Sequence, residues 1–306
     1  MMPVFGGWVK NPQLSEPVSF EHMKKIAAEA ETNEYHSLWI PDHLLNPVKG
    51  EDYPSLEAWT TLAALAPITE HVKLAHTTLC YAFRHPAIVA KMSATLDAIS
   101  NGRFILGMGA CWFEREFQAY GLEFLSHDRR VEAAGEAMEL IKELWTKREV
   151  TFKGKHFRVE RAILEPKPIQ KPRPPMWYGG TSQASERIAA EQADVWLFSS
   201  ETQEILADRI KKFEDKHLRK IEYAMSAIVI MSESTDKAIE LAKKCFPDKP
   251  SSVLSSGLIG SRKHIANKVE QLAQIGVNYI LIQFPLDTID TMRKLGKEVL
   301  SSYSVN

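Results

Sequence analysis

The chain has 306 residues, of which 44% are hydrophobic and 25% charged, as in an ordinary globular protein. Its 38 Lys and Arg residues against 39 Asp and Glu residues give a formal net charge of −1. Because there is no long basic block, neither nucleic acid nor an anionic membrane is expected as a partner, and a small-molecule site is predicted instead.

The cysteines and the apolar runs exclude further classes. Cys80, Cys111 and Cys245 are too few and too scattered for a disulfide framework or a Cys-x-x-Cys metal site. No apolar stretch reaches the roughly 18 residues of a membrane helix, and no secretory signal pattern opens the chain. We therefore expect a soluble cytoplasmic protein with no metal site.

Short β-branched or aromatic runs alternate with longer amphipathic runs, which is typical of βα units and a parallel sheet. Such units form an open doubly wound sheet or a closed barrel. An open dinucleotide-binding sheet needs G-x-G-x-x-G after an early strand, and Trp112 stands where its third glycine belongs. The pattern therefore favours a barrel in one domain over 1–306, with strands at Ser37–Ile40, Val72–Leu79, Phe104–Met108, Met176–Gly179, Val195–Phe198, Ala227–Met231 and Tyr279–Phe284.

The stretch from 83 to 121 is the most informative. Pro86 can open a helix, and apolar residues recur at helical spacing until Asn101-Gly102 ends it. A strand then leads to Gly109 and Ala110, which would let a ligand approach the backbone closely. The residues of the helical stripe are Ile88, Val89, Met92, Leu96 and Ile99.

Several short motifs stand in this stretch in a fixed order: Arg84-His85-Pro86, LDAISNGR over 96–103, Trp112, Glu116-Phe117 and Gly121. With this spacing the chain closely resembles the bacterial-luciferase-like flavin monooxygenase superfamily over nearly its whole length. The resemblance implies a (β/α)8 TIM barrel that binds a flavin or a deazaflavin. Relatives carry an apolar first strand before a loop like Val4–Trp8, so either Met2–Phe5 serves as a truncated first strand or the true start lies upstream.

Two insertions are expected in this barrel. The region 149–175 is rich in proline and predicts a structured, extended connection. The region 246–261 is rich in Ser, Gly and Pro, and relatives place a mobile active-site lid there.

In a barrel, ligands bind at the carboxyl ends of the strands. Gly179-Gly180-Thr181-Ser182 follows a strand and opens a helix, and it is either an ordinary N-cap or a phosphate cradle. The resemblance favours the cradle, because relatives hold the phosphate of flavin mononucleotide (FMN) with such a motif. Asp42 and His43 form either a solvated turn or, as the resemblance implies, part of the flavin pocket. Thr77, Gly109 and Ala110 also follow strands, and we expect them at the cofactor.

The run Ser126-His127-Asp128 cannot converge into a hydrolytic triad and is better explained as a helix cap. Relatives that use FMN often have a tyrosine where Arg130 stands, near His127 at the phosphate. An arginine would suit the more charged tail of the deazaflavin factor 420. Arg130 therefore favours the deazaflavin, and Gly180-Thr181-Ser182 favours FMN.

Three functions remain open, with the first slightly preferred. In the first, a separate reductase supplies reduced FMN, which uses dioxygen to oxygenate a small organic substrate. The second is hydride transfer by reduced deazaflavin, and the third is flavin binding without turnover. No residue is predicted as a catalytic acid or base, and a homodimer or higher homo-oligomer is expected.

Cys111, Trp112, Ser226 and Phe284 are predicted to line the substrate pocket. Trp112 could roof that pocket or pack on the adjoining loop. Relatives that oxidise alkanesulfonates carry an Arg-x-His pair and a tyrosine where Ser226, Ile228 and Phe284 stand here. A sulfonate would therefore be a poorly paired buried anion.

Overall fold

The structure is a computed structural model that describes residues 18–285 and 288–300. The expected first strand, Met2–Phe5, lies outside the described residues. The chain divides into two compact units. The first comprises Met1–Leu38, Leu45–Leu56 and Leu197–Asn306, and the second comprises Trp39–Leu44 and Glu57–Trp196.

The second unit holds a parallel sheet in the order β1-β2-β4-β7, with the short β3 paired to β4. All six residues of β4 are buried, as expected for a strand covered on both faces. The strands are β1 (Ser37–Ile40), which crosses the unit boundary, β2 (Lys73–His76), β3 (Leu79–Cys80), β4 (Phe104–Gly109) and β7 (Met176–Gly179).

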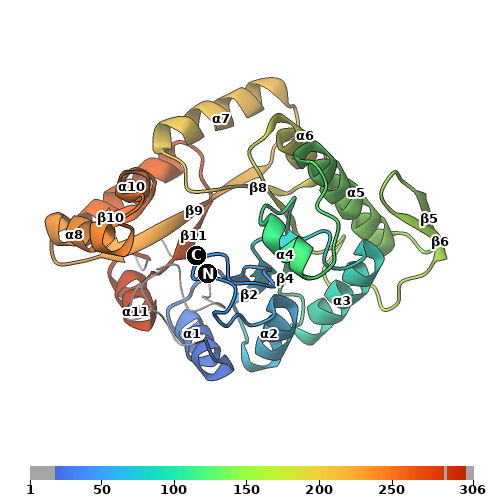
Figure 1. Cartoon of the computed structure of the whole chain (residues 1–306), viewed down its shortest axis with the longest axis horizontal. Coiled ribbons are helices and arrows are strands. Elements are labelled where there is room, and N and C mark those ends of the chain that lie inside the picture. Colours follow the sequence, from blue (N-terminus) through green and yellow to red (C-terminus); the bar gives the residue numbers. More distant parts are fainter. Residues whose placement is uncertain (1–17, 286–287, 301–306) are drawn as a thin grey trace. The chain divides into compact units, whose positions relative to one another are not determined.

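Helices of this unit cover the sheet, and α5 packs between α3 and α6 (Figure 1). Arg103, from the LDAISNGR motif, explains part of this arrangement, because its guanidinium donates to the carbonyls of Ala66, Thr69 and Val72. The motif therefore joins η2 to the start of β4. The helices are α2 (Ala58–Leu65), η2 (Ala66–Ile68), α3 (Pro86–Ile99), α4 (Glu114–Ala119), α5 (His127–Thr146) and α6 (Gln183–Gln192).

The predicted insertion at 149–175 contains an antiparallel hairpin of β5 (Val150–Lys153) and β6 (Arg158–Ala162). Glu136 of α5 accepts hydrogen bonds from the backbone N–H groups of Lys155, His156 and Phe157. A side chain at Gly154 would overlap that carboxylate. The Glu136 carboxylate therefore fastens the hairpin to α5.

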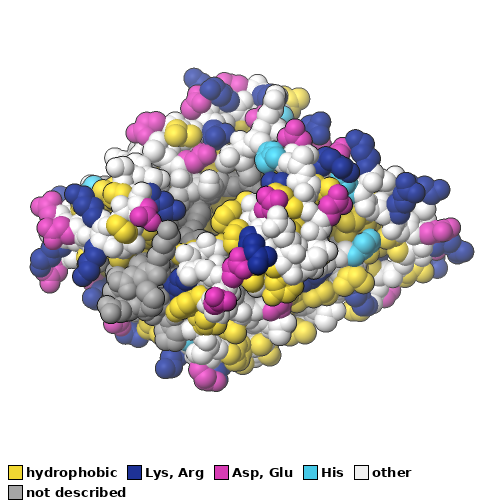
Figure 2. Space-filling model, viewed as in Figure 1, with side chains coloured by type: hydrophobic (Ala, Val, Ile, Leu, Met, Phe, Trp, Pro, Cys, Tyr) yellow, Lys and Arg dark blue, Asp and Glu magenta, His cyan; other side chains and the backbone are white. Residues whose placement is uncertain are grey.

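In the first unit, β9 pairs in parallel with β10 and β11, and β8 precedes it in the sheet. The strands are β8 (Val195–Phe198), which crosses the unit boundary, β9 (Glu222–Met231), β10 (Leu258–Gly260) and β11 (Tyr279–Gln283). The helices are α1 (Phe20–Thr32), α7 (Gln203–Lys216), α8 (Thr235–Cys245), α9 (Pro250–Ser256), α10 (Arg262–Gln274) and α11 (Thr288–Glu298). On the face shown in Figure 2, cations and anions are interspersed along α7, α8 and α10.

Most sequence predictions of strands are confirmed, and three predicted segments need correction. The predicted strand Val72–Leu79 is two strands, because Thr77 and Thr78 form a turn between β2 and β3. β9 begins earlier than predicted, at Glu222. The prediction of a loop over 246–261 is wrong, because this region contains α9 and β10. Val253 of α9 packs into a core with Phe246 and Ile259.

The predicted apolar stripe of α3 is also only partly buried. Val89 and Leu96 are buried, but Ile88 and Ile99 are 56% and 51% exposed. Their spacing is helical, yet the sheet contacts a narrower face of α3 than the stripe indicated.

None of the helices in the described ranges has the length and apolarity to cross a membrane.

Candidate functional site

Asp42 follows β1 at the carboxyl edge of the sheet and is buried. Its Oδ2 accepts the Cys80 N–H at 3.0 Å, and the Arg84 guanidinium donates to both carboxylate oxygens at 2.9 and 3.2 Å. Arg84 also contacts Glu57. Burial raises the pKa of Asp42, and the Arg84 charge opposes that rise. Asp42 therefore ties β1 to β3, and Arg84 of the RHP motif supplies its counter-charge.

His43 is held by a buried glutamate. Its Nδ1 lies 3.1 and 3.2 Å from the two carboxylate oxygens of Glu116, which also accepts the Leu44 N–H at 2.9 Å. Glu116 is only 1% exposed. A carboxylate at Nδ1 fixes the orientation and tautomer of an imidazole, so the ring is presented in one pose.

Two aromatic rings complete the surroundings of His43. Trp112 and Phe113 meet it edge-on, with ring centroids 5.8 and 6.3 Å away. Trp112 itself is 63% exposed. The structure thus brings together the motif containing Asp42 and His43 and the one containing Trp112 and Glu116. Sequence reasoning quoted Glu116 only as part of the family motif and missed it as a site residue.

The end of β4 lies against Thr78. A Cβ at Gly109 would lie 2.4 Å from Thr78 Oγ1, so the glycine makes room for that threonine. Thr77, also predicted at the cofactor, donates its N–H to the Ile40 carbonyl at 2.9 Å, and the Thr77–Thr78 peptide is cis. The Thr78 side chain therefore fills the space beside Gly109.

Cys80 and Cys111 are joined by a disulfide, with Cα atoms 5.7 Å apart. This corrects the expectation from cysteine spacing, which gave no disulfide. The two residues are 31 positions apart, but β3 pairs with β4 so that Cys80 stands opposite Gly109, two residues before Cys111. Cys245 is free and buried.

The turn after β7 has the features of an anion cradle. Gly180 has φ +152°, and a Cβ there would lie 2.6 Å from Ser185 Oγ. Ser182 caps α6 by accepting the Ser185 N–H at 3.2 Å, and the two serine hydroxyls are 2.9 Å apart. One hydroxyl of the pair therefore keeps a proton that it can donate elsewhere.

Tyr178, the residue before this turn, has a buried hydroxyl with no hydrogen-bond partner among the residues described. Its ring carbon Cε1 would lie 3.5 Å from a Cβ placed at Gly180. Burial raises the pKa of Tyr178 to about 12, and the nearby Ser185 hydroxyl, which lies outside hydrogen-bonding geometry, opposes the shift, so the group stays a neutral donor. A buried donor without a partner beside a helix N-terminus fits an anionic ligand group.

The two residues predicted at the start of α5 are held within their own segment. His127 is exposed and its Nδ1 lies 3.2 Å from Asp128. Arg130 is buried, donates to the Leu125 carbonyl at 2.6 Å and lies 4.0 Å above the Phe124 ring. Its Nε is buried without a hydrogen-bond partner in the described parts of the chain. The local use of this guanidinium weakens the sequence argument for a deazaflavin.

Ser226 and Phe284 belong to the first unit. Ser226 Oγ accepts from Gln283, and its carbonyl accepts the Ser200 hydroxyl at 2.8 Å. Phe284 is buried, and Ile228 packs on the core of α8 and α9. Arg262 and Lys263, two cations that follow the region 246–261 in the sequence, are the first residues of α10.

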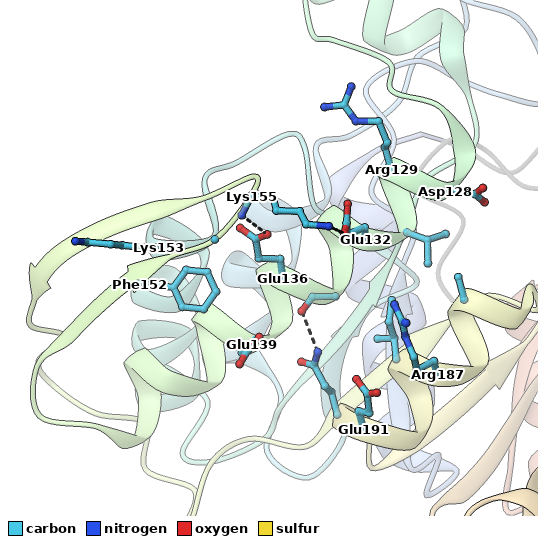
Figure 3. Close-up of a pocket in the computed structure, with 16 residues that line it drawn as sticks. Asp128, Arg129, Glu132, Glu136, Glu139, Phe152, Lys153, Lys155, Arg187 and Glu191 are labelled. Atoms are coloured by element: carbon cyan, nitrogen blue, oxygen red, sulfur yellow. Dashed lines mark hydrogen bonds and ion pairs between the residues drawn. The ribbon is translucent and has the colours of Figure 1, made fainter.

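A pocket of 780 Å³ lies elsewhere, between α5, α6 and the β5–β6 hairpin (Figure 3). Glu132 and Glu136 point from α5 toward the hairpin, where they bind Lys155 and His156. Arg187 and Glu191 line it from α6. Because many of its lining residues are charged, and Glu132 and Glu136 are already bound by the hairpin, this pocket does not suit a flat flavin ring. No cluster suited to a metal ion occurs in residues 18–285 or 288–300.

The family model described as luciferase-like monooxygenase matches residues 2–256. The chain belongs to this family. It is therefore an enzyme, and its α/β fold is that of the luciferase-like TIM barrels, as the sequence predicted.

Solved structures with the same fold include the monooxygenase RslO1 from Streptomyces bottropensis, at 20% identity and TM-score 0.79, covering 97% of this chain and 98% of that one. The coenzyme F420 dependent tetrahydromethanopterin reductase from Methanopyrus kandleri matches at 20% identity and TM-score 0.78, covering 94% and 96%. Riboflavin lyase, solved with modified FMN and riboflavin, matches at 16% identity and TM-score 0.78, covering 93% and 84%. Of these solved structures, one is named for coenzyme F420 and another was solved with modified FMN.

Proposed function

We propose that this enzyme is a flavin-dependent monooxygenase that uses reduced FMN and dioxygen to oxygenate a small organic molecule. The observation that carries the proposal is the turn after β7. Gly180, the Ser182–Ser185 hydroxyl pair and the unpartnered Tyr178 hydroxyl lie together at the N-terminus of α6. These donors fit the single phosphate of FMN.

Bound reduced FMN would supply the electrons and activate the oxygen. The chain's own residues would bind and position the cofactor and exclude water. His43, fixed by Glu116 and flanked by Trp112, would present one ring edge to the flavin in a set tautomer. Asp42 and Arg84 would keep that loop in place.

The deazaflavin alternative is weaker on this structure because Arg130, its main support, is committed to Leu125 and Phe124. Titration calorimetry with reduced FMN, the deazaflavin and NADH separates the alternatives. We expect binding of FMN, and at most weak binding of the other two. Tight deazaflavin binding without FMN binding would assign the enzyme to hydride transfer, and binding of neither flavin type would contradict the proposal altogether.

We also propose that the substrate is neutral or weakly polar. Ser226, Ile228 and Phe284 offer no positive charge, and burying a sulfonate without one costs several kcal/mol. With an FMN reductase supplied, sulfones and aldehydes should be oxygenated faster than alkanesulfonates of matched size. Efficient sulfite release from the sulfonates would contradict this part.

Three further parts of the proposal concern the protein's setting. A separate reductase would supply reduced FMN, the protein would act in the cytoplasm, and the chain would form a homodimer. The exposed Ile88 and Ile99 of α3 support a subunit contact on that helix. The family match runs through parts of both units, which supports the prediction of one functional domain.

A further inference from the structure

A single covalent bond ties the loop that carries Trp112 to the neighbouring strand. Cys80 ends β3 and is 1% exposed, whereas Cys111 lies two residues beyond β4 and is partly exposed. Their Cα separation of 5.7 Å is in the usual range for a disulfide. Reagents in solution can therefore reach the pair from the Cys111 side.

The two halves of this bond differ in how firmly the backbone is held. The Cys80 N–H donates to Asp42, which is itself clamped by Arg84. Cys111 has φ +62°, a left-handed conformation that residues other than glycine adopt infrequently. When the bond is broken, Cys80 stays anchored and the backbone at Cys111 can leave that conformation.

The loop released in this way leads directly to the His43 surroundings. Trp112 and Phe113 contact the His43 ring, and Glu116, which binds its Nδ1, follows in α4. Trp112 is 63% exposed, and it also packs against its neighbour Phe113, which lies on the same loop. A change in the backbone at Cys111 would therefore alter the contacts that hold the His43 ring.

We propose that Cys80 and Cys111 form a reversible redox pair that sets the position of the Trp112 loop, fixed when oxidised and released when reduced. Oxidation by a peroxide removes two electrons and two protons from the two thiols, joins the sulfurs and leaves two waters. Reduction by a dithiol reverses the step by exchange and leaves the reductant as a disulfide. The pairing itself does not depend on the proposed FMN reaction; only its effect on turnover does.

Thiol counting and hydrogen exchange test the pair without any flavin. After treatment with hydrogen peroxide, alkylation under denaturing conditions should label one cysteine, Cys245, and after dithiothreitol it should label all three. Amides of residues 110–116 should exchange at least about tenfold faster in the reduced protein, the change expected for loss of a local restraint. In Cys111→Ser this exchange should be fast under both conditions.

Cys245→Ser is the matched control, because Cys245 is buried in the first unit. Its amide exchange should respond like that of the wild type, and it should show one labelled thiol fewer under each condition, none after peroxide and two after dithiothreitol. Three labelled thiols after peroxide would overturn the pairing. Equal exchange over 110–116 in the oxidised and reduced wild type would overturn the proposed release of the loop. FMN affinity measured in the two states then reports whether the loop position matters to the site, and an unchanged affinity and turnover would overturn a functional role.

Discussion

At the scale of single residues, the candidate site depends on carboxylates that are used to place other groups. Asp42 and Glu116 are both nearly fully buried, and each accepts a backbone N–H as well as a side-chain contact. Buried carboxylates of this kind are stable only while these contacts are intact. Their effect on function is expected to pass through His43 and the loop after β1.

Glu116→Gln tests this placement. The glutamine can still accept the Leu44 N–H, but it can present an amide N–H₂ to His43 Nδ1, so the ring would turn or change tautomer. We expect FMN affinity to fall by about 1 kcal/mol, or about fivefold, the net value of one hydrogen bond. Calorimetric titration measures it.

Glu114→Gln is the control on the same helix, since Glu114 is exposed and contacts only Gln118 among the residues described. It should leave FMN affinity unchanged. If both substitutions lowered FMN affinity equally, Glu116 would act through its negative charge alone and not through its contact with His43.

At the scale of elements, strands were predictable where a short apolar run stands between turns. Ser37–Ile40, Met176–Gly179 and Val195–Phe198 match residue for residue. β10 was missed because its three residues, one of them glycine, carry no periodicity. Glu116 was missed because its partner is 73 positions away, and the Cys80–Cys111 pair because only strand pairing brings its halves together.

The β5–β6 hairpin gives a prediction at this scale. Glu136→Ala removes the acceptor of three backbone N–H groups at the hairpin turn, and unsatisfied amides should lower stability by about 1–3 kcal/mol. Urea unfolding measures the loss, and FMN affinity should not change. Glu139→Ala, on the same helix but exposed, should have little effect. Equal stability of the two variants would contradict the fastening role of Glu136.

At the scale of the whole molecule, acid stability is expected to depend on His76. This side chain is fully buried and stacks on Trp59, with ring centroids 4.8 Å apart. Neither of its ring nitrogens has a hydrogen-bond partner within residues 18–285 and 288–300. Burial lowers its pKa to about 3 from 6.5. Between these values the unfolded chain binds a proton that the folded chain does not, so stability falls as the pH falls below about 6.5.

The expected slope is up to about 1.4 kcal/mol per pH unit from this one group. His76→Leu should flatten the pH dependence of the free energy of unfolding between pH 4 and 6, whereas His127→Gln, at an exposed site, should not. Urea unfolding across this range makes the comparison. An unchanged slope in His76→Leu would show that other groups govern acid stability.

The central claim is that the turn after β7 holds the phosphate of FMN, and the most direct measurement is the FMN affinity of Ser182→Ala beside that of Ser234→Ala. Both serines cap helices by accepting a backbone N–H at 3.2 Å, so both variants should lose similar stability. Only Ser182→Ala should weaken FMN binding, by about 1–3 kcal/mol, the value of a charge-assisted hydrogen bond. If both variants lose stability and both keep the wild-type affinity, Ser182 is a helix cap only and the phosphate site lies elsewhere.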